Sequence, residues 1–191
     1  MARAELKASD KLTTRDRILE SAQRCFSSAS YEQVGLRNIA EDVGVDVAYV
    51  HRTFGSKEKL FTEVLRLSFA LDRTAQASAS DLVTKFTKDV FRPANTNNDS
   101  IDPLRIVVHS LSSATALSVQ RQFILEEVIG PLAGQIDTDG EVRASMIAAL
   151  LLGIRILRDV IELEALGCAH HNTLEALTTR MLEFCLGAVS E

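Results

Sequence analysis

The side chains whose types and spacing could do chemistry lie mainly between Leu36 and Lys57 of this 191-residue chain. Basic, aromatic and small polar residues there alternate with apolar ones at helical spacing, so they fall on the outer faces of two short helices. Basic and hydroxyl side chains bind phosphates, while small and hydroxyl-bearing side chains can read base edges in the major groove of DNA. The candidate DNA-contacting residues are Arg37, Asp46, Val47, Ala48, Tyr49, His51, Arg52 and Lys57.

Each of these candidates also has a more ordinary interpretation. Arg37 and Lys57 each stand at the start of a predicted helix, where the helix N-terminus also attracts a phosphate. A solvated surface charge is the alternative for both, and for Arg52 it is nearly as good an explanation. Tyr49 and Ala48 are the expected base readers, through a hydroxyl hydrogen bond or contact with a thymine methyl group.

No pattern in the sequence indicates catalysis. There is no Gly-x-Ser-x-Gly, His-Glu-x-x-His or phosphate-cradling glycine loop, and the three cysteines form no Cys-x-x-Cys pair. The histidines lack metal-ligand spacing, although a loop with Cys168, His170 and His171 leaves metal capture open as an alternative. We therefore expect no enzyme activity, no cofactor and no resident metal. The four histidines are His51, His109, His170 and His171.

Three short amphipathic helices and the start of a fourth are predicted to position the DNA-contacting residues. Apolar residues such as Ile18 and Phe26 form the buried stripe of the first helix, which a threonine at Thr13 or the next position can cap. The fourth helix begins after Ser56, which can cap it, and its periodicity extends to about Thr74. A long helix of this kind is a natural connector between an N-terminal head and the rest of the chain.

The second and third helices form a helix-turn-helix at Leu36–Phe54. Gly44 supplies a turn position that tolerates a left-handed backbone, and Asp46 can cap the third helix. Val50 and Phe54 face inward in that helix, which leaves its opposite face free. Two short helices held at a steep angle suit the second one to the major groove.

The remainder of the chain is expected to be helical too, so the fold class is all-α. Only 5% of the residues are aromatic, Trp is absent and 46% are hydrophobic, which favours packed helices over a β-sandwich. Polar residues 92–100 form a loop between helices. The expected helices are Asp81–Phe91, Leu104–Ala116, Val119–Leu132 interrupted at Gly130–Pro131, Glu141–Glu164 and Thr173–Val189.

Charge is unevenly distributed along the chain. The formal net charge is −5, but residues 1–66 carry 11 Lys/Arg and 10 Asp/Glu, whereas residues 67–191 carry 10 and 16. The DNA-facing part is therefore near neutral, and the acidic remainder helps to keep the rest of the chain off DNA. No signal peptide or membrane-spanning apolar stretch is present, so we expect a cytoplasmic protein with no membrane partner.

Residues 13–65 resemble the DNA-binding domain of the tetracycline-repressor (TetR) family of bacterial transcription regulators. The resemblance implies a three-helix helix-turn-helix head joined by a long fourth helix to a C-terminal helical body for ligand binding and dimerisation. The implied boundaries are a flexible N-terminal arm at residues 1–12, the DNA-binding domain at 13–58 and the body at 59–191. The matching segments are Arg17-Ile18-Leu19 with Ala22 and Phe26, Leu36-Arg37-Asn38-Ile39-Ala40, Gly44-Val45, and Phe54-Gly55-Ser56-Lys57-Glu58-Lys59-Leu60-Phe61.

Three positions depart from the family pattern. Gly35 occupies the cap position before the second helix, where the family usually has Thr or Ser, so a capping hydroxyl is lost. His51 stands where the family often has a phosphate-contacting tyrosine, and Thr53 where it often has a histidine. His51 could still donate to a phosphate, more weakly when neutral, and Tyr49 could take over part of that role.

A helical body commonly encloses a ligand pocket between its helices. Arg105 and His109 share a helix face at a spacing of four residues, so both could meet an anionic or polar ligand. A satisfied core histidine and a surface charge are equally good interpretations. The candidate ligand-binding residues are Phe69, Phe86, Arg105, His109, Ser113, Phe123 and Met146.

The last two apolar helices carry more hydrophobic surface than a small body needs. The resemblance implies that they pack against a second copy of the chain as a four-helix interface. A homodimer would hold two recognition helices about one DNA turn, roughly 34 Å, or a multiple apart, as a palindrome requires. The candidate interface residues are Ile147, Leu150, Leu151, Ile154, Leu157, Ile161, Leu174, Leu177, Met181 and Phe184.

The sequence therefore predicts a sequence-specific DNA-binding transcription regulator, in the form of a repressor released from a palindromic operator by an unknown small-molecule effector. Ligand binding would favour a body conformation that spoils the spacing of the heads. One alternative is an architectural helix-turn-helix protein without an inducer, which would bind random DNA tightly. The other is a helical ligand-binding module that has lost DNA binding, which would not bind DNA even at low salt.

Overall fold

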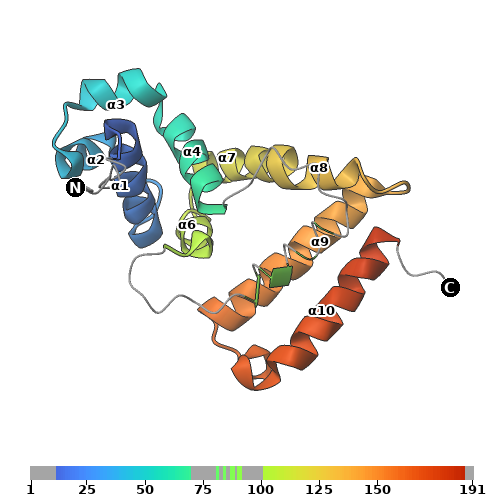
Figure 1. The fold of residues 1–191 in the computed structure, drawn as a ribbon. Coiled ribbons are helices and arrows are strands. Elements are labelled where there is room, and N and C mark those ends of the chain that lie inside the picture. The colour runs from blue at the N-terminus through green and yellow to red at the C-terminus, as the bar shows by residue number, and fades with distance from the viewer. Residues whose placement is uncertain are drawn as a thin grey trace, which may run out of the picture.

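The computed structural model describes residues 12–69 and 101–187, together with residues 81, 84, 87–88 and 90–91. Within these residues every regular element is helical, which confirms the predicted all-α fold (Figure 1). Residues 1–11 of the predicted arm, and the predicted end of the fourth helix, lie outside the described residues. The N-terminal helices are α1 (Thr14–Ser28), α2 (Leu36–Val43), α3 (Val47–Phe54) and α4 (Lys57–Phe69).

The C-terminal part is a succession of longer and shorter helices. Two of them pass into π-helical turns, η1 and η2, and two short 3₁₀ turns, η3 and η4, precede the last helix. In chain order these are α6 (Pro103–His109), α7 (Ala114–Ile124), η1 (Leu125–Ile129), α8 (Gly130–Ala133), α9 (Gly140–Arg155), η2 (Ile156–Val160), η3 (Glu164–Leu166), η4 (Cys168–His170) and α10 (His171–Leu186).

The predicted caps and turns of the head are confirmed. The Thr13 hydroxyl accepts a hydrogen bond from the Asp16 amide, and the Asp16 carboxylate accepts one from the Thr13 amide, which forms a capping box. Gly44 closes α2 with a left-handed φ of 76°. The Asp46 carboxylate accepts a hydrogen bond from the Ala48 amide at 2.6 Å and so caps α3. Local chemistry therefore fixes the start and end of each head helix.

One predicted helix is two helices in the structure. Its apolar spacing runs across Leu104–Ala116, but α6 ends at His109 and α7 begins at Ala114. The Ser113 hydroxyl accepts a hydrogen bond from the Ala116 amide at 3.1 Å. This bond gives the backbone an alternative to a continuous helix and starts a new one.

The long apolar helix also ends earlier than predicted. It leaves α-geometry after Arg155, continues through η2 and stops at Glu162, whose φ is 57°. The Leu163 amide donates to the Leu157 carbonyl at 2.9 Å across this left-handed residue. Such a backbone bond satisfies a terminal carbonyl and ends the helix before Glu164.

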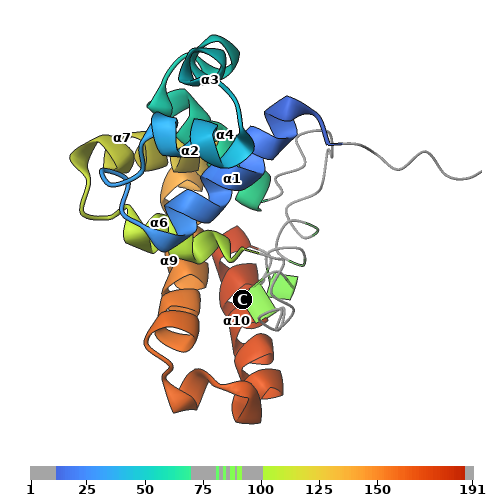
Figure 2. The same cartoon turned by 90° about the vertical axis from the view of Figure 1, so that its left-hand side faces the viewer.

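The buried apolar side chains form two cores. The first core joins α1–α4 with α6 and α7, and α6 packs against α1 with Ile106 fully buried. The second core joins Val90 and Phe91 with residues of η1, α8, α9 and α10. Helices α9 and α10 lie side by side, below the first core in Figure 2. The division between the cores does not fall at residue 58, because α4, α6 and α7 share the core of the head.

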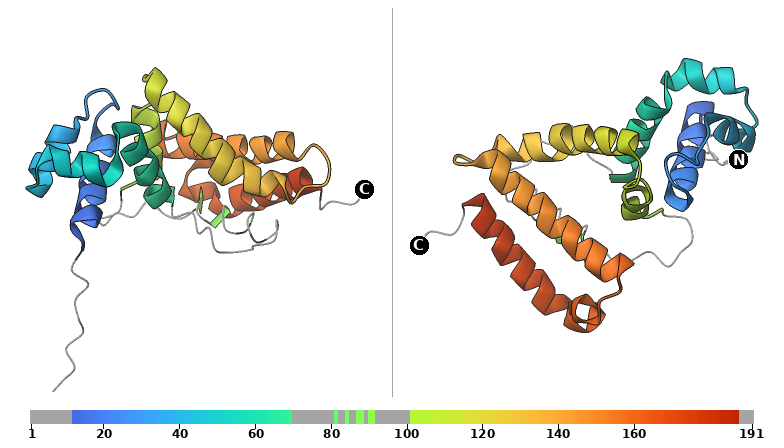
Figure 3. Two further views of the ribbon diagram at one scale, coloured as in Figure 1. Left: turned by 90° about the horizontal axis from the view of Figure 1, so that it is seen from above. Right: turned by 180° about the vertical axis from the view of Figure 1, so that it is seen from behind.

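Helices α7 and α8, with η1 between them, lead from the first core to the second, and α9 then turns back (Figure 3). Helix α9 therefore ends near the side of the molecule that carries α6. None of the helices in the described ranges is long and apolar enough to cross a membrane.

Candidate nucleic-acid interface

The inner face of α3 is anchored in the first core. Val50 is fully buried and Phe54 is 7% exposed, as the spacing predicts. Ala48 and Arg52 are consequently exposed on the outer face of the helix. A small residue beside an arginine on an exposed helix face can approach base edges and phosphates together.

The other α3 candidates are held partly within the head. Val47 and Tyr49 are half-buried and pack against the first core, so only part of each side chain faces outward. Thr53 donates its hydroxyl to the Tyr49 carbonyl at 2.8 Å, which occupies that hydroxyl within the helix. His51 is exposed, with its ring Nδ1 3.5 Å from the Gly55 carbonyl oxygen.

The start of α2 is an exposed helix N-terminus beside a basic residue. Gly35 is the N-cap and supplies no side-chain hydrogen bond, as predicted. Arg37 is exposed in the first turn of the helix. Amide groups at a helix start attract anions, and the guanidinium adds a positive charge next to them. This corner can bind a backbone phosphate.

Lys57 has a partner inside the head that sequence reasoning missed. Its Nζ donates to the Tyr31 carbonyl and lies 4.2 Å from the centroid of the Tyr31 ring. Burial lowers the pKa of Lys57, while the nearby Glu32 and Glu58 act in the opposite direction. The phosphate contact predicted for Lys57 therefore competes with an internal contact that ties α4 to the turn after α1.

A polar network fastens α2 to α1. Asp42 accepts hydrogen bonds from the Ser21 hydroxyl at 2.6 Å and from Arg24 at 2.8 Å, and these hold the pKa of Asp42 below its ordinary value. Arg17 donates to the Val43 carbonyl at 2.8 Å, at the end of α2. These contacts set the angle of α2 relative to α1. They join residues far apart in the chain, so no short-range spacing in the sequence predicts them.

A hollow of about 310 Å³ lies beside the end of α3. Arg15 pairs with Glu63 at 2.7 Å and lies 5.2 Å from the Phe54 ring centroid, and Arg66 pairs with Glu63 at 3.0 Å. The positive charges of Arg15 and Arg66 are thus neutralised by Glu63 within the head. We therefore interpret the hollow as a structural feature of the head. The lining residues are Arg15, Thr53, Phe54, Lys59, Thr62, Glu63 and Arg66.

The predicted ligand pocket is not assembled as expected. Arg105 and His109 are exposed on α6, and Met146 is 54% exposed on α9, so these three do not line an enclosed cavity. Ser113 is buried, but it caps α7 and donates its hydroxyl to Glu32 at 2.5 Å. The apolar spacing predicts a helix here, but it does not predict which side of the helix faces the interior. The hydrogen bond from Ser113 joins two segments that are 81 residues apart in the chain.

Two of the predicted pocket residues do meet. The Phe69 and Phe123 rings lie 5.8 Å apart, with Phe123 buried and Phe69 partly exposed. This contact joins the end of α4 to α7. Phe86 lies outside the described residues.

Three residues of the predicted dimer interface are buried inside the chain. Ile147, Leu151 and Ile154 are 1%, 9% and 8% exposed and belong to the second core, so they offer almost no surface to another chain. The apolar side of α9 faces its own α8 and α10. The other predicted positions keep a partial or full exposure. These are Leu150, Leu157, Ile161, Leu174, Leu177, Met181 and Phe184.

Among the described residues, no group of three or more His, Cys, Asp or Glu side chains is placed to hold a metal ion. Cys25 and Cys185 are free thiols. Burial raises the pKa of Cys25, and the neighbouring Asp42 acts in the same direction. A thiol of this kind packs as a small apolar side chain rather than reacting as a thiolate.

Two family models match the chain. The model described as bacterial regulatory proteins of the tetR family matches residues 18–64. The model described as the tetracyclin repressor-like C-terminal domain matches residues 87–186. The two matches cover the helix-turn-helix and the helical body in turn.

Curated relatives are similar over a shorter segment. The chain is 38% identical over 55 residues to the HTH-type transcriptional repressor AcnR of Corynebacterium efficiens, a segment that is 29% of either chain. It is 40% identical over 60 residues to AcnR of Corynebacterium glutamicum, covering 31% of this chain and 32% of that one. The similarity therefore spans about a third of the length of these relatives.

Solved structures share the fold over nearly the whole chain. A TetR-family regulator from Streptomyces coelicolor is 25% identical, with a TM-score of 0.53 and coverage of 95% of this chain and 99% of that one. GusR of Salmonella enterica is 21% identical, with a TM-score of 0.57 and coverage of 93% and 100%. The reduced form of Escherichia coli NemR is 16% identical, with a TM-score of 0.56 and coverage of 93% and 96%.

Proposed function

Because the chain belongs to the tetracycline-repressor family of bacterial regulatory proteins, we propose that it is a homodimeric transcription repressor. It reads a palindromic DNA operator in the cytoplasm and leaves that operator when a small molecule binds. The family consists of transcription regulators rather than enzymes, so no residue is assigned a catalytic role.

One observation carries the DNA-binding part of the proposal. The first core buries the inner faces of α2 and α3, which leaves Arg37, Ala48 and Arg52 exposed on one helix-turn-helix. Base-reading and phosphate-binding groups are thus displayed together on rigid helices. Arg37 and Arg52 act on phosphates, while Ala48 and the outward part of Tyr49 read bases.

Selection of bound sequences from a random DNA pool, with the full chain, tests this proposal. We expect a palindrome whose half-sites lie about one helical turn, roughly 34 Å, or a multiple apart. Uniform binding of random sequences would favour an architectural protein instead, and no binding at low salt would favour a module that has lost this activity.

The salt dependence of binding tests the phosphate contact. Arg37→Ala should weaken binding to all sequences and reduce the slope of log K against log salt by about 1 for each protomer. Arg121→Ala is the control, because Arg121 is exposed on α7, outside the helix-turn-helix and outside the proposed dimer interface. An unchanged slope in Arg37→Ala would remove Arg37 from the interface.

Exposed apolar stripes on α9 and α10 support the homodimer. Leu177, Met181 and Phe184 follow one another at helical spacing and are 52%, 53% and 70% exposed. Met146 on α9 and Leu157 in η2 are also exposed, at 54% and 41%. Exposed apolar patches of this extent mark interaction surfaces, and a second copy presents the same stripes by symmetry.

Sedimentation equilibrium tests the interface. Phe184→Glu should weaken dimerisation by ~2 kcal/mol or more, since buried aromatic anchors dominate interface energies. Glu183→Arg is the matched control, because the adjacent residue is exposed and points about 100° away around the helix. A wild-type chain that sediments as a monomer at micromolar concentration would contradict the homodimer.

The effector part of the proposal has a narrower basis. The hydroxyls of Thr87 and Ser110 are buried and have no hydrogen-bond partner among the described residues. Such groups are costly unless something satisfies them, and a bound polar ligand can do so. A thermal-shift screen of small metabolites should find a compound that raises Tm of wild type and releases the selected DNA. A compound that raises Tm without releasing DNA would contradict this role.

A further inference from the structure

Within the described residues 101–187, the backbone passes from the first core to the second through η1. Phe123 on α7 belongs to the first core, Ile129 at the end of η1 belongs to the second, and Ile124 packs against both. Over the described part of the chain, the extensively packed helix pairs lie within one core or the other, and η1 packs against α7, α8 and α9. A π-helical turn interrupts the α-helical hydrogen-bond ladder and is a common place for a helix to bend.

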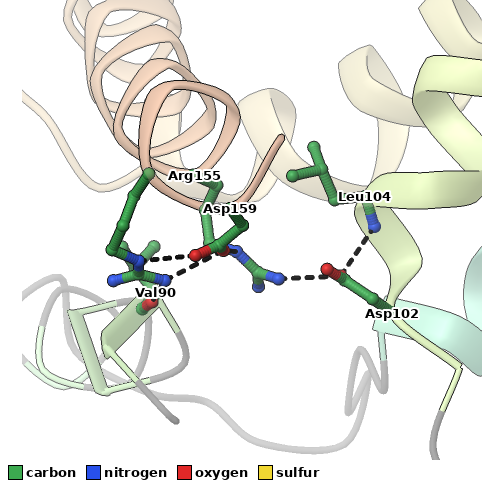
Figure 4. A network of polar contacts seen from close by, with 6 residues as sticks. Val90, Asp102, Leu104, Arg155 and Asp159 are labelled. Carbon is green, nitrogen blue, oxygen red and sulfur yellow. Dashed lines mark hydrogen bonds and ion pairs between the residues drawn. The ribbon is translucent and has the colours of Figure 1, made fainter. Parts of the chain in front are cut away.

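A cluster of ion pairs makes a second connection between the cores (Figure 4). At the end of α9, Arg155 pairs with Asp102 at 2.7 Å and with Asp159 at 2.8 Å. Asp102 is the N-cap of α6, and the same carboxylate oxygen accepts a hydrogen bond from the Leu104 amide at 3.0 Å. An arginine on the central helix of the second core therefore holds the first residue of a helix that belongs to the first core.

The rest of the cluster keeps Arg155 in place. Arg158 pairs with Asp159 at 2.6 Å and donates to the Val90 carbonyl, which ties η2 to the helical segment before α6. Burial alone would raise the pKa of Asp159, but Arg158 and Arg155 hold it below its ordinary value, so the carboxylate stays charged at neutral pH. Side chains in the cluster are only 15% to 31% exposed, so solvent and salt screen them less than surface pairs.

Polar contacts also join the helices of the first core to one another and to η1. On α4, Arg66 donates to Glu127 of η1 through Nε at 3.0 Å and through Nη2 at 2.9 Å. The Ser113 hydroxyl joins the cap of α7 to Glu32, in the turn that leads to α2. Helices α6 and α7 are thus bound to the helix-turn-helix by packing and by polar contacts, and they would move with it as one unit.

We propose that the Arg155–Asp102 ion pair is a latch that sets the angle between the two cores, with η1 as the hinge. The moving unit is α1–α4 together with α6 and α7, rather than the helix-turn-helix alone. A ligand that binds better to the unlatched arrangement would shift the population toward it. In a dimer held by α9 and α10, a rotation at η1 changes the distance between the recognition helices.

The latch deepens the proposed function, since its consequence for the operator depends on DNA binding, but the joint itself can be measured without DNA or effector. Spin labels at Glu41→Cys on α2 and Glu183→Cys on α10 report one core each, because both positions are exposed and Glu183 points away from the Phe184 stripe. Cys25, Cys168 and Cys185 are replaced by alanine in this background. Labelled chains are diluted with unlabelled ones, so pulsed electron–electron resonance measures distances within one chain.

Two variants open the latch and one serves as control. Arg155→Met removes the positive charge, and Asp102→Ser removes the carboxylate that pairs with Arg155 while leaving a hydroxyl that caps α6. Arg143→Met is the matched control on the same helix, because Arg143 donates to the Phe184 and Cys185 carbonyls within the second core. Circular dichroism establishes that each variant is folded.

Both latch variants should give a shifted and broader distance distribution than the parent, and the control should superimpose on the parent. A distribution for Asp102→Ser that superimposes on the parent would overturn the latch, whatever Arg155→Met does. The same shift in Arg143→Met would overturn it too, because the effect would then be general softening. A chain that shifts as expected but binds no DNA would refute the proposed function and leave the latch standing.

Discussion

The first core is filled and covered by side chains of a single chain. Phe26, Tyr31 and Phe61 form a cluster of rings with centroids 4.8 to 5.8 Å apart, and all three side chains are buried. Contacts between distant segments fasten its surface, such as the Lys57 ammonium on the Tyr31 carbonyl. Aromatic packing and charged donors to backbone carbonyls both stabilise a fixed geometry.

The helices of the second core, by comparison, leave apolar side chains exposed to solvent. Its interior is mainly aliphatic, and one side of α10 exposes Leu177, Met181 and Phe184. A surface of that kind is costly in water unless another chain covers it. The difference indicates that the DNA-reading unit is rigid on its own, whereas the second core reaches its full stability as part of an assembly.

The largest expected effect breaks the first core. Phe61→Ala should lower the free energy of unfolding by ~3–5 kcal/mol, because it removes a fully buried ring from the aromatic cluster. Chemical denaturation measures this loss. Phe184→Ala is the comparison on the exposed side of α10, and its effect should shrink as the protein is diluted, since it acts through association. Equal, concentration-independent losses in both variants would remove the contrast between the cores.

The next effect concerns the fastening of the first core. Lys57→Met should cost about 1–2 kcal/mol, since it removes a charged donor to a backbone carbonyl and a cation–π contact with Tyr31. Lys59→Met is the control, because Lys59 is exposed two residues further along α4. Equal stability of the two variants in denaturant titrations would contradict a stabilising role for the contact between Lys57 and Tyr31.

Backbone conformation gives a third contrast. The first core places Gly44 at a φ of 76°, whereas the second places Glu162 at a φ of 57°. Glu162→Gly should therefore raise the free energy of unfolding by about 0.5–1 kcal/mol, and Gly44→Ala should lower it by about 1 kcal/mol. Thermal unfolding of the pair checks both signs, and a destabilised Glu162→Gly would show that its side chain has another role.

The smallest effect is a dependence on pH. Hydrogen bonds from Ser21 and Arg24 lower the pKa of Asp42 from its ordinary 3.8. Its contribution is therefore complete above that value and is lost as the pH falls through the lower, folded-state pKa. Asp42→Asn should flatten the acid limb of the stability curve, at a cost below ~1 kcal/mol near neutrality because solvent screens the exposed pair. Unfolding midpoints measured across acid pH test this, and an acid limb identical to wild type would contradict it.

Much of the head could be predicted because its signals are local. Asp46 caps α3 through an amide two residues away, and Gly44 tolerates the left-handed turn by its own backbone freedom. The inward direction of Val50 and Phe54 follows from helical spacing. The outer face that carries Ala48 and Arg52 follows in turn, and their contacts with DNA stay predictions.

Predictions for the C-terminal part differ from the structure where they depend on how a helix is rotated about its axis or on which distant residue a side chain contacts. Apolar spacing cannot tell which of two apolar faces a helix buries, and Ile147, a predicted dimer-interface residue, lies in the second core. Ser113 has the chemistry of either a pocket hydroxyl or a cap. Its hydrogen bond to Glu32, 81 residues away in sequence, is what decided between them.

The sequence alone determined the all-α fold, the caps and turns of the helix-turn-helix and the residues on its outer face. These depend on interactions within one or two helical turns, which spacing and residue type express directly. Only the tertiary structure decided that α6 and α7 belong to the head's core, that Lys57 serves Tyr31, and that Arg155 reaches the cap of α6. Those contacts join segments far apart in the chain, and their partners are chosen by packing geometry, which no local pattern contains.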